Sequence, residues 1–137
     1  MDLRVRFPVD DAALDALHAA AFGGAATGVP WRARLERHAL TWVGAFDGET
    51  LVGFVQVAWD GGAHAFLLDT AVRPDLQGQG IGNALVARAA TEAAAAGCEW
   101  LHADYEPGLA PFYAACGFRP AAAGLLRLAG PDAPRVG

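Results

Sequence analysis

The chain has 137 residues, of which 54% are hydrophobic and 18% are charged, and its formal net charge at pH 7 is −5. This length and composition predict one globular domain over residues 1–137. The chain contains no lysine, and arginine supplies all ten of its Lys-or-Arg positions. P-loop nucleotide hydrolases and Schiff-base enzymes are therefore excluded, because both need a lysine.

The charge and hydropathy also limit the partners of the protein. A net negative charge argues against a nucleic-acid ligand, which needs a basic patch. No apolar run reaches the ~18 residues that a membrane span needs, so no membrane partner is expected. The charged N-terminal segment MDLRVRFPVDD does not resemble a signal peptide, which predicts a cytoplasmic protein.

Two cysteines raise the question of a disulfide or a metal site. In a reducing compartment, Cys98 and Cys116 are expected to be free thiols. Together with His102 they could suggest a metal site, but their spacing matches no zinc ribbon or finger. The sequence therefore predicts no metal.

The N-terminal third predicts a strand followed by two helices. Residues 3–9 form the strand, and Asp10 or Asp11 can cap the helix that follows. The glycine pair that begins at Gly23 ends this helix. A second helix is expected to begin at Pro30, where the missing N–H of proline would be unpaired in any case.

An antiparallel meander of three strands comes next, over residues 41–46, 51–59 and 64–72. The first two strands are joined at Asp47-Gly48, a strong hairpin signal. The second strand is apolar on both faces, which predicts a central strand covered by helices.

The C-terminal half predicts a helix, a strand, a short helix and further strands. The first helix runs from Ile81 to a stop at Gly97, and residues 99–105 form the strand. A short helix over 109–116 is followed by one or two strands over 118–128. In the first helix, five apolar residues share one face: Ile81, Leu85, Val86, Ala89 and Ala93. This order of elements predicts an α+β fold in which helices flank both faces of a mixed, mostly antiparallel sheet.

Three glycines stand at alternate positions between the last strand of the meander and this helix: Gly78, Gly80 and Gly82. They leave the backbone uncovered where the helix begins with unpaired N–H groups and a partial positive charge. Such a turn can bind a pyrophosphate without a basic side chain, and Gln77 and Asn83 can add hydrogen bonds at its rim. The alternative is a glycine-rich turn that only redirects the chain.

A dinucleotide site is a further interpretation of this turn. Gly78 and Gly80 match the first two glycines of G-x-G-x-x-G, and Asp104 stands about 20 residues on, where a ribose-binding acid would be. Asn83 occupies the third glycine position, however, and the preceding strand belongs to an antiparallel meander. Both departures argue against a dinucleotide.

Two motifs give the sequence a specific resemblance. The pattern Gln77-x-x-Gly80-x-Gly82, preceded by residues 69–75, resembles motif A of the GNAT N-acetyltransferase superfamily. Residues 111–118 resemble motif B of the same family, and the order of elements agrees along nearly the whole chain. The resemblance implies a GNAT-like fold and an N-acetyltransferase that transfers the acetyl group of acetyl-CoA to an amine of a small molecule or peptide.

The resemblance also implies where acetyl-CoA binds. The cosubstrate would lie in a V-shaped opening between the strands over 64–72 and 99–105. A backbone N–H near Val72 would polarise the thioester carbonyl. The residues assigned to acetyl-CoA by similarity are Ala71, Val72, Arg73, Gln77, Gly78, Gln79, Gly80, Ile81, Gly82, Asn83 and Phe112.

For catalysis, the resemblance assigns Tyr113 as the general acid that protonates the CoA sulfur. The alternative for Tyr113 is packing in the core. Asp69 lies among apolar neighbours on its strand and is the candidate general base, or else a structural carboxylate bonded to the backbone.

The sequence departs from the family pattern at two positions. Glu106 replaces the asparagine that many members carry seven residues before the tyrosine, and Gln77 replaces a common arginine near the pyrophosphate. Asp104 and Glu106 could bind a cationic amine or be solvated. The Glu106 departure and the undecided base leave a second hypothesis open, a non-catalytic module that binds acyl-CoA.

The amine acceptor carries no motif. Four residues could line its pocket or could pack in the core: Trp31, Trp42, Trp59 and His38. An exposed aromatic surface near Trp59 would suit the interface of a homodimer.

Overall fold

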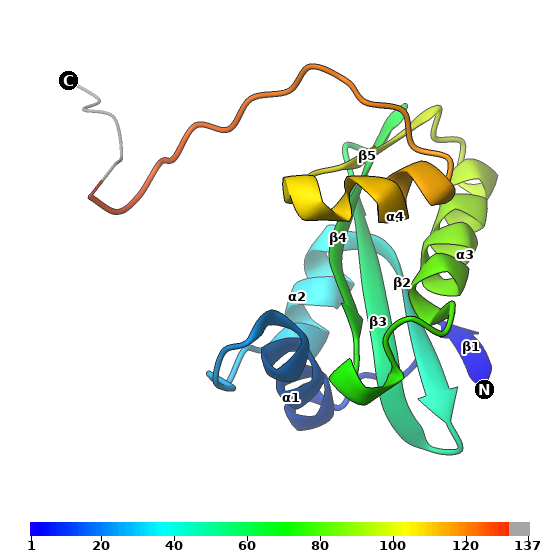
Figure 1. The fold of residues 1–137 in the computed structure, drawn as a ribbon, viewed down its shortest axis with the longest axis vertical. Helices are drawn as coiled ribbons and strands as arrows, with labels where there is room; N and C mark the ends of the chain where they lie inside the picture. The colour runs from blue at the N-terminus through cyan, green and yellow to red at the C-terminus, as the bar shows by residue number, and fades with distance from the viewer. Residues whose placement is uncertain (132–137) are drawn as a thin grey trace.

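A computed structural model describes residues 1–131 and shows one five-stranded sheet in the order β1-β2-β3-β4-β5 (Figure 1). Neighbouring strands are antiparallel, except that β4 and β5 are parallel. The strands are β1 Asp2–Val5, β2 Ala39–Asp47, β3 Thr50–Trp59, β4 His64–Val72 and β5 Trp100–Ala103.

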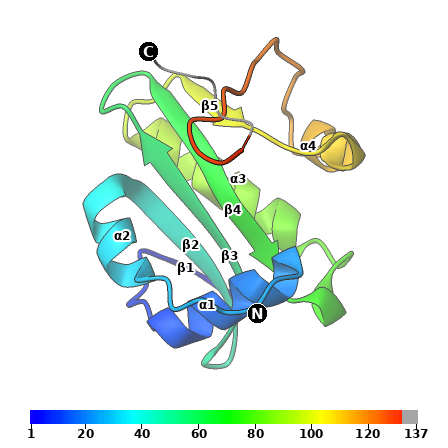
Figure 2. The same cartoon turned by 90° about the vertical axis from the view of Figure 1, so that its left-hand side faces the viewer.

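Four α-helices accompany the sheet within the described residues: α1 Asp11–Phe22, α2 Trp31–His38, α3 Ile81–Ala95 and α4 Ala110–Ala115. Figure 2 shows α1 and α2 on one face of the sheet and α3 on the other, while α4 lies beyond the end of β5. The predicted α+β fold, with helices on both faces of a mixed sheet, is confirmed.

β3 is the central strand, as its two apolar faces predict, and its six middle residues are buried. On the side of α1 and α2, Phe54 packs edge-on against Trp31, with ring centroids 6.0 Å apart. On the side of α3, Val55 belongs to the cluster that contains Leu85. The sheet therefore has two cores, one under each helical layer.

The predicted signals at the helix ends are confirmed. The Asp10 side chain caps α1 by accepting a hydrogen bond from the Ala13 N–H at 3.1 Å. The helix ends at Gly23, whose φ of +76° favours glycine. The face predicted for the long helix is the buried face of α3: Ile81, Leu85, Val86, Ala89 and Ala93.

The strand predicted over residues 3–9 is wrong in its second half, because β1 ends at Val5. Arg6 has a φ of +51°, which no extended strand allows, and Pro8 has no N–H to donate. Phe7 and Val9 are nevertheless buried, since the chain turns them into the core under α1 and α2.

The strands predicted over residues 118–128 are also wrong, because this segment has no strand and leaves the body of the protein (Figure 1). Leu125, Leu126 and Leu128 are 71–87% exposed. The alanines and glycine at 121–124 have low strand propensity, and leucines alone do not give the alternating face that a sheet needs.

The last predicted strand and helix are shorter than expected. The 99–105 strand is confined to β5, and the 109–116 helix to α4. Within residues 1–131, no helix is both long enough and apolar enough to cross a membrane.

Candidate active site

A gap opens in the sheet between β4 and β5. The two strands pair from His64 with Trp100 to Leu67 with Ala103 and then separate, while β4 continues to Val72. Successive N–H groups of a strand point to opposite edges. Because the Arg73 N–H donates to the Val52 carbonyl at 2.9 Å within the sheet, the Val72 N–H faces the gap.

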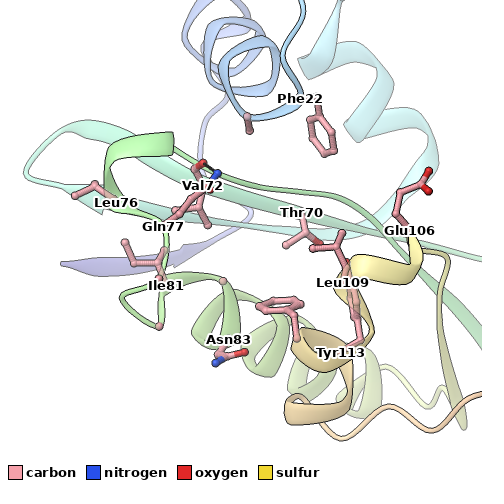
Figure 3. A pocket seen from close by; sticks show the side chains of 15 residues that line it. Phe22, Thr70, Val72, Leu76, Gln77, Ile81, Asn83, Glu106, Leu109 and Tyr113 are labelled. Carbon is pink, nitrogen blue, oxygen red and sulfur yellow. Dashed lines mark hydrogen bonds between the residues drawn. The ribbon is translucent and has the colours of Figure 1, made fainter.

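A cleft of about 620 Å³ occupies this gap, a size typical of small-molecule sites. Figure 3 shows Val72 and Gln77 at one end of the cleft, and Phe22 and Glu106 at the other. Tyr113 lies between the two ends. The cleft therefore joins the glycine turn to the C-terminal end of α1.

The glycine turn forms the first end. Gly78 and Gly80 have φ values of +79° and +86°, and a Cβ at either position would meet nothing within 4 Å. Gly80 begins α3 without a side-chain cap, and the first N–H that bonds back to it is that of Ala84, at 3.1 Å. The N–H groups between Gly80 and Ala84 are therefore free for an anion, in open space at the positive end of a 15-residue helix.

Gly82 has a different role from the other two glycines. A Cβ there would lie 3.1 Å and 3.2 Å from ring carbons of Phe112. This close approach brings α4 against the first turn of α3. The sequence pattern therefore requires glycine at 82 for packing, and at 78 and 80 for backbone conformation.

Two polar side chains border the turn. The Gln77 amide donates to the Val72 carbonyl at 3.2 Å, and Asn83 accepts a hydrogen bond from the Cys116 Sγ at 3.1 Å. Burial raises the pKa of the Cys116 thiol, which keeps it protonated as this donor.

Tyr113 lines the cleft, and its ring is tightly packed. The ring is stacked on Tyr105 at 4.5 Å, with an interplanar angle of 13°. Phe112 and Phe118 contact it edge-on, with ring centroids 4.9 Å and 5.5 Å away. In residues 1–131 no side chain or backbone group forms a hydrogen bond with the hydroxyl, so the rigid ring leaves it available to a ligand.

The second end of the cleft combines apolar surface with one charge. Phe22 and Leu109 are 58% and 48% exposed at its edge. Among the described residues that line the cleft, Glu106 carries the one carboxylate. Asp104, the other acidic candidate, does not line it.

Asp69 lies behind the wall of the cleft. Its Oδ1 is 2.9 Å from the His18 Nε2, and its Oδ2 accepts a hydrogen bond from the Gln56 amide at 2.6 Å. Its φ of +58° is rare for a residue with a side chain, and the register between β3 and β4 shifts at this point. Thr70, the next residue, does line the cleft.

Most residues assigned to the cosubstrate gather in the cleft: Val72, Gln77, Gly78, Gly80, Ile81, Gly82, Asn83 and Phe112. Three others do not line it. Ala71 is buried under α1 and α2, and Gln79 is exposed beside the turn. Arg73 forms a bidentate ion pair with Asp75 at 2.7 Å and 3.2 Å, which raises the pKa of the guanidinium and lowers that of the carboxyl.

None of the aromatic candidates for an acceptor pocket lines the cleft. Trp31 and Trp42 are buried in the core, and His38 and Trp59 lie elsewhere on the surface. The sequence reasoning instead missed Phe22 and Leu109, which carry no motif. It also missed the partners of Asp69, although Gln56 stood out as a polar residue inside an apolar strand.

The described residues contain no group of three His, Cys, Asp or Glu side chains that could hold a metal ion. Cys98 and Cys116 are free cysteines.

The comparisons with known proteins agree with this geometry. The model of the acetyltransferase (GNAT) family matches residues 11–118. A GNAT family acetyltransferase from Streptococcus pneumoniae is 24% identical, with a TM-score of 0.74 over 92% of this chain and 96% of that one. A protein from Agrobacterium tumefaciens is 21% identical, with a TM-score of 0.80 over 93% and 99% of the two chains.

A glucosamine-6-phosphate N-acetyltransferase from Arabidopsis thaliana is 14% identical, with a TM-score of 0.70 over 93% of this chain and 98% of that one. At these identities the solved structures show a shared fold alone. The search of curated proteins found no match. The family model spans α1 to the end of α4 and so includes both strands of the gap, the glycine turn and Tyr113; the chain belongs to the GNAT family of acetyltransferases.

Proposed function

We propose that the protein transfers the acetyl group of acetyl-CoA to a primary amine that is cationic in solution, on a small molecule or a peptide. The observation that carries the proposal is one cleft that contains a free anion cradle, an unpaired strand edge and an unbonded tyrosine hydroxyl. These groups suit the binding of acetyl-CoA, the stabilisation of the developing oxyanion and the protonation of the leaving sulfur.

The residues of the cleft fit the two polar parts of acetyl-CoA, its pyrophosphate and its amide-bearing arm. The open space beside Gly78 and Gly80, with the free N–H groups at the start of α3, suits a pyrophosphate. The unpaired edge of β4 at Val72 suits an extended arm with amide groups, which would bind as an added strand. When bound, acetyl-CoA supplies an activated thioester.

Three groups of the cleft carry out the remaining steps of the reaction. The Val72 N–H donates to the thioester oxygen and stabilises the negative charge that develops there. Tyr113 donates its proton to the departing sulfur. Glu106 attracts the ammonium group of the acceptor to the second end of the cleft, and Phe22 and Leu109 contact the apolar part of that molecule.

A second function has one observation in its favour. Glu106 replaces the asparagine of the family pattern and lines the cleft, so the cleft departs from that of the family's enzymes at this position. We therefore keep a non-catalytic acyl-CoA-binding module as the alternative.

The test incubates the purified protein with acetyl-CoA and a panel of alkylamines, arylalkylamines and peptides. Free thiol is measured with a disulfide reagent, and the acetylated product is identified by mass spectrometry. Turnover of at least one amine supports the proposal. Tight binding of CoA without product from any amine supports the acyl-CoA-binding module, and the absence of CoA binding contradicts both.

A further inference from the structure

A hydrogen-bonded cluster of His18, Gln56 and Asp69 lies beside the second end of the cleft. Its members come from α1, β3 and β4, and two short contacts join them at Asp69, 2.9 Å from His18 Nε2 and 2.6 Å from Gln56 Nε2. Gln56 is buried, while the His18 and Asp69 side chains are 28% and 27% exposed. The cluster is therefore partly buried, and two of its three side chains reach the surface.

The bonding of Asp69 makes it a poor first acceptor of a substrate proton. The amide nitrogen of Gln56 can only donate, so Oδ2 of Asp69 is an acceptor. The contact with His18 occupies Oδ1 in the same way. With both oxygens engaged, Asp69 holds its neighbours in place. The left-handed backbone at Asp69 indicates that the surrounding packing imposes this position.

The same bonds leave one basic atom free. When the His18 Nε2 carries the proton that Asp69 accepts, the lone pair of the neutral imidazole is on Nδ1. The ring packs against Phe22, at a centroid distance of 4.5 Å, and against Trp31, at 4.9 Å. In the described residues, Nδ1 has no hydrogen-bond partner. His18 therefore offers an oriented, unoccupied proton acceptor.

The position of His18 relates it to the acceptor end of the cleft. Ala21 and Phe22, which line the cleft, follow His18 by three and four residues on α1, so they lie one turn away on the same side of the helix. Thr70, which also lines the cleft, follows Asp69. The cluster therefore adjoins the wall on which the acceptor amine would lie.

Charged or polar side chains lie near His18 on each element packed around it. From β4, Asp69 contributes a carboxylate, and β3 contributes the neutral Gln56. On α1, the Asp15 carboxylate lies one turn earlier and accepts hydrogen bonds from Gly28 N at 2.7 Å and from Trp31. On α2, the Arg34 guanidinium lies over the Trp31 ring, 5.3 Å from its centroid. The closest charge is thus the anionic Asp69, which stabilises an imidazolium once it forms.

We propose that His18 is the general base of the reaction and that Asp69 and Gln56 are its positioning residues. The inference rests on the proposed function. The acceptor ammonium loses one proton to the His18 Nδ1, directly or through one water, and the neutral amine forms the C–N bond as the C–S bond breaks. Tyr113 protonates the departing sulfur, and the second proton of the amine nitrogen restores Tyr113. His18 then releases its proton to solvent.

The test compares two classes of acceptor amine in the wild type and in His18→Gln. An alkylamine is an ammonium at neutral pH and needs a base, whereas an aromatic amine is already neutral. We expect His18→Gln to lower kcat/KM for the alkylamine by about 100-fold or more, and for the aromatic amine by less than about threefold. In the variant, kcat/KM for the alkylamine should instead follow the fraction of neutral amine and rise with pH toward the pKa of that amine. His38→Gln, at the exposed last position of α2, is the matched control.

Asp69→Asn provides the second measurement. It keeps the shape of the side chain but removes the charge that stabilises the imidazolium, so the pH profile should change and its plateau should fall. Binding of CoA by calorimetry, which needs no base, should stay within about threefold of the wild type in every variant. This readout also shows that each variant is folded.

Equal losses for the two classes of amine in His18→Gln, or an unchanged pH profile in both variants, would overturn the inference. If the wild type turns over an amine and either of these results is found, the assignment of His18 as the base is refuted while the proposed acetyltransferase activity is supported. Failure of the wild type with every amine contradicts the proposed function itself. If His18→Gln does not fold, His18→Asn serves as the second variant.

Discussion

Gly80 provides the sharpest test of the anion cradle, because one added methyl group enters the space that the pyrophosphate would occupy. Its φ is +86°, and a Cβ would meet no protein atom within 4 Å. Gly80→Ala therefore adds backbone strain and fills part of the cradle, without a clash inside the protein. Gly97 has the same properties, with a φ of +95° and an equally open Cβ position, at the far end of α3. Gly97→Ala is thus a matched control.

Both substitutions should destabilise the protein by similar amounts. The left-handed conformation costs about 1–2 kcal/mol for alanine, and the smaller entropy of the unfolded chain offsets about 0.4–1 kcal/mol of this. The expected net loss in the free energy of unfolding is therefore about 1 kcal/mol for each variant, measured by urea denaturation.

The two variants should differ only in ligand binding. If the methyl group displaces the pyrophosphate from one backbone N–H, the loss of a hydrogen bond to a charged group costs about 1.5–3 kcal/mol, or about 10–100-fold in Kd. Calorimetric titration with CoA should show this loss in Gly80→Ala, and no loss in Gly97→Ala. Wild-type affinity in Gly80→Ala, together with the expected loss of stability, would refute the cradle.

Four further outcomes are expected. Tyr113→Phe should lower kcat by about 100-fold or more while CoA affinity is retained, because only the proton donor is lost; unchanged turnover would show that the acid is elsewhere. Glu106→Gln should raise KM for a cationic amine, and the difference in KM from the wild type should shrink as salt is added. A KM that changes neither with the substitution nor with salt would contradict the ammonium contact. The Gly28 N–H holds the pKa of the Asp15 carboxyl below its ordinary value. The carboxylate therefore stabilises the fold at any pH above the pKa that Asp15 has in the unfolded chain. This stabilisation is lost as pH falls through the lower pKa that Asp15 has in the folded protein. The stability difference between wild type and Asp15→Asn in urea should therefore narrow at acid pH, and a difference that widens would be contrary to the sign of the shift. Leu85→Ala should reduce the free energy of unfolding by about 2–5 kcal/mol, since the side chain is fully buried between α3 and the sheet; a loss below about 1 kcal/mol would mean that the core collapses to fill the cavity.

Much of the fold follows from local signals in the sequence. The apolar face of α3, the cap at Asp10 and the strand over residues 64–72 are all where the pattern predicts them. These signals are reliable because the period of the side chains and the chemistry of a cap act within one or two turns. The strands predicted over residues 118–128 are absent because a strand also needs a neighbouring strand to pair with, and a local pattern does not supply one.

The sequence by itself determined the glycine turn, the position of Tyr113 and the family, because each depends on residue type at a short spacing. Only the tertiary structure decided what surrounds them. Phe22 reaches the cleft because α1 packs across β3 and β4, and Asp69 is committed to His18 and Gln56 because three distant segments meet there. Such contacts arise from packing between layers, which no local pattern encodes.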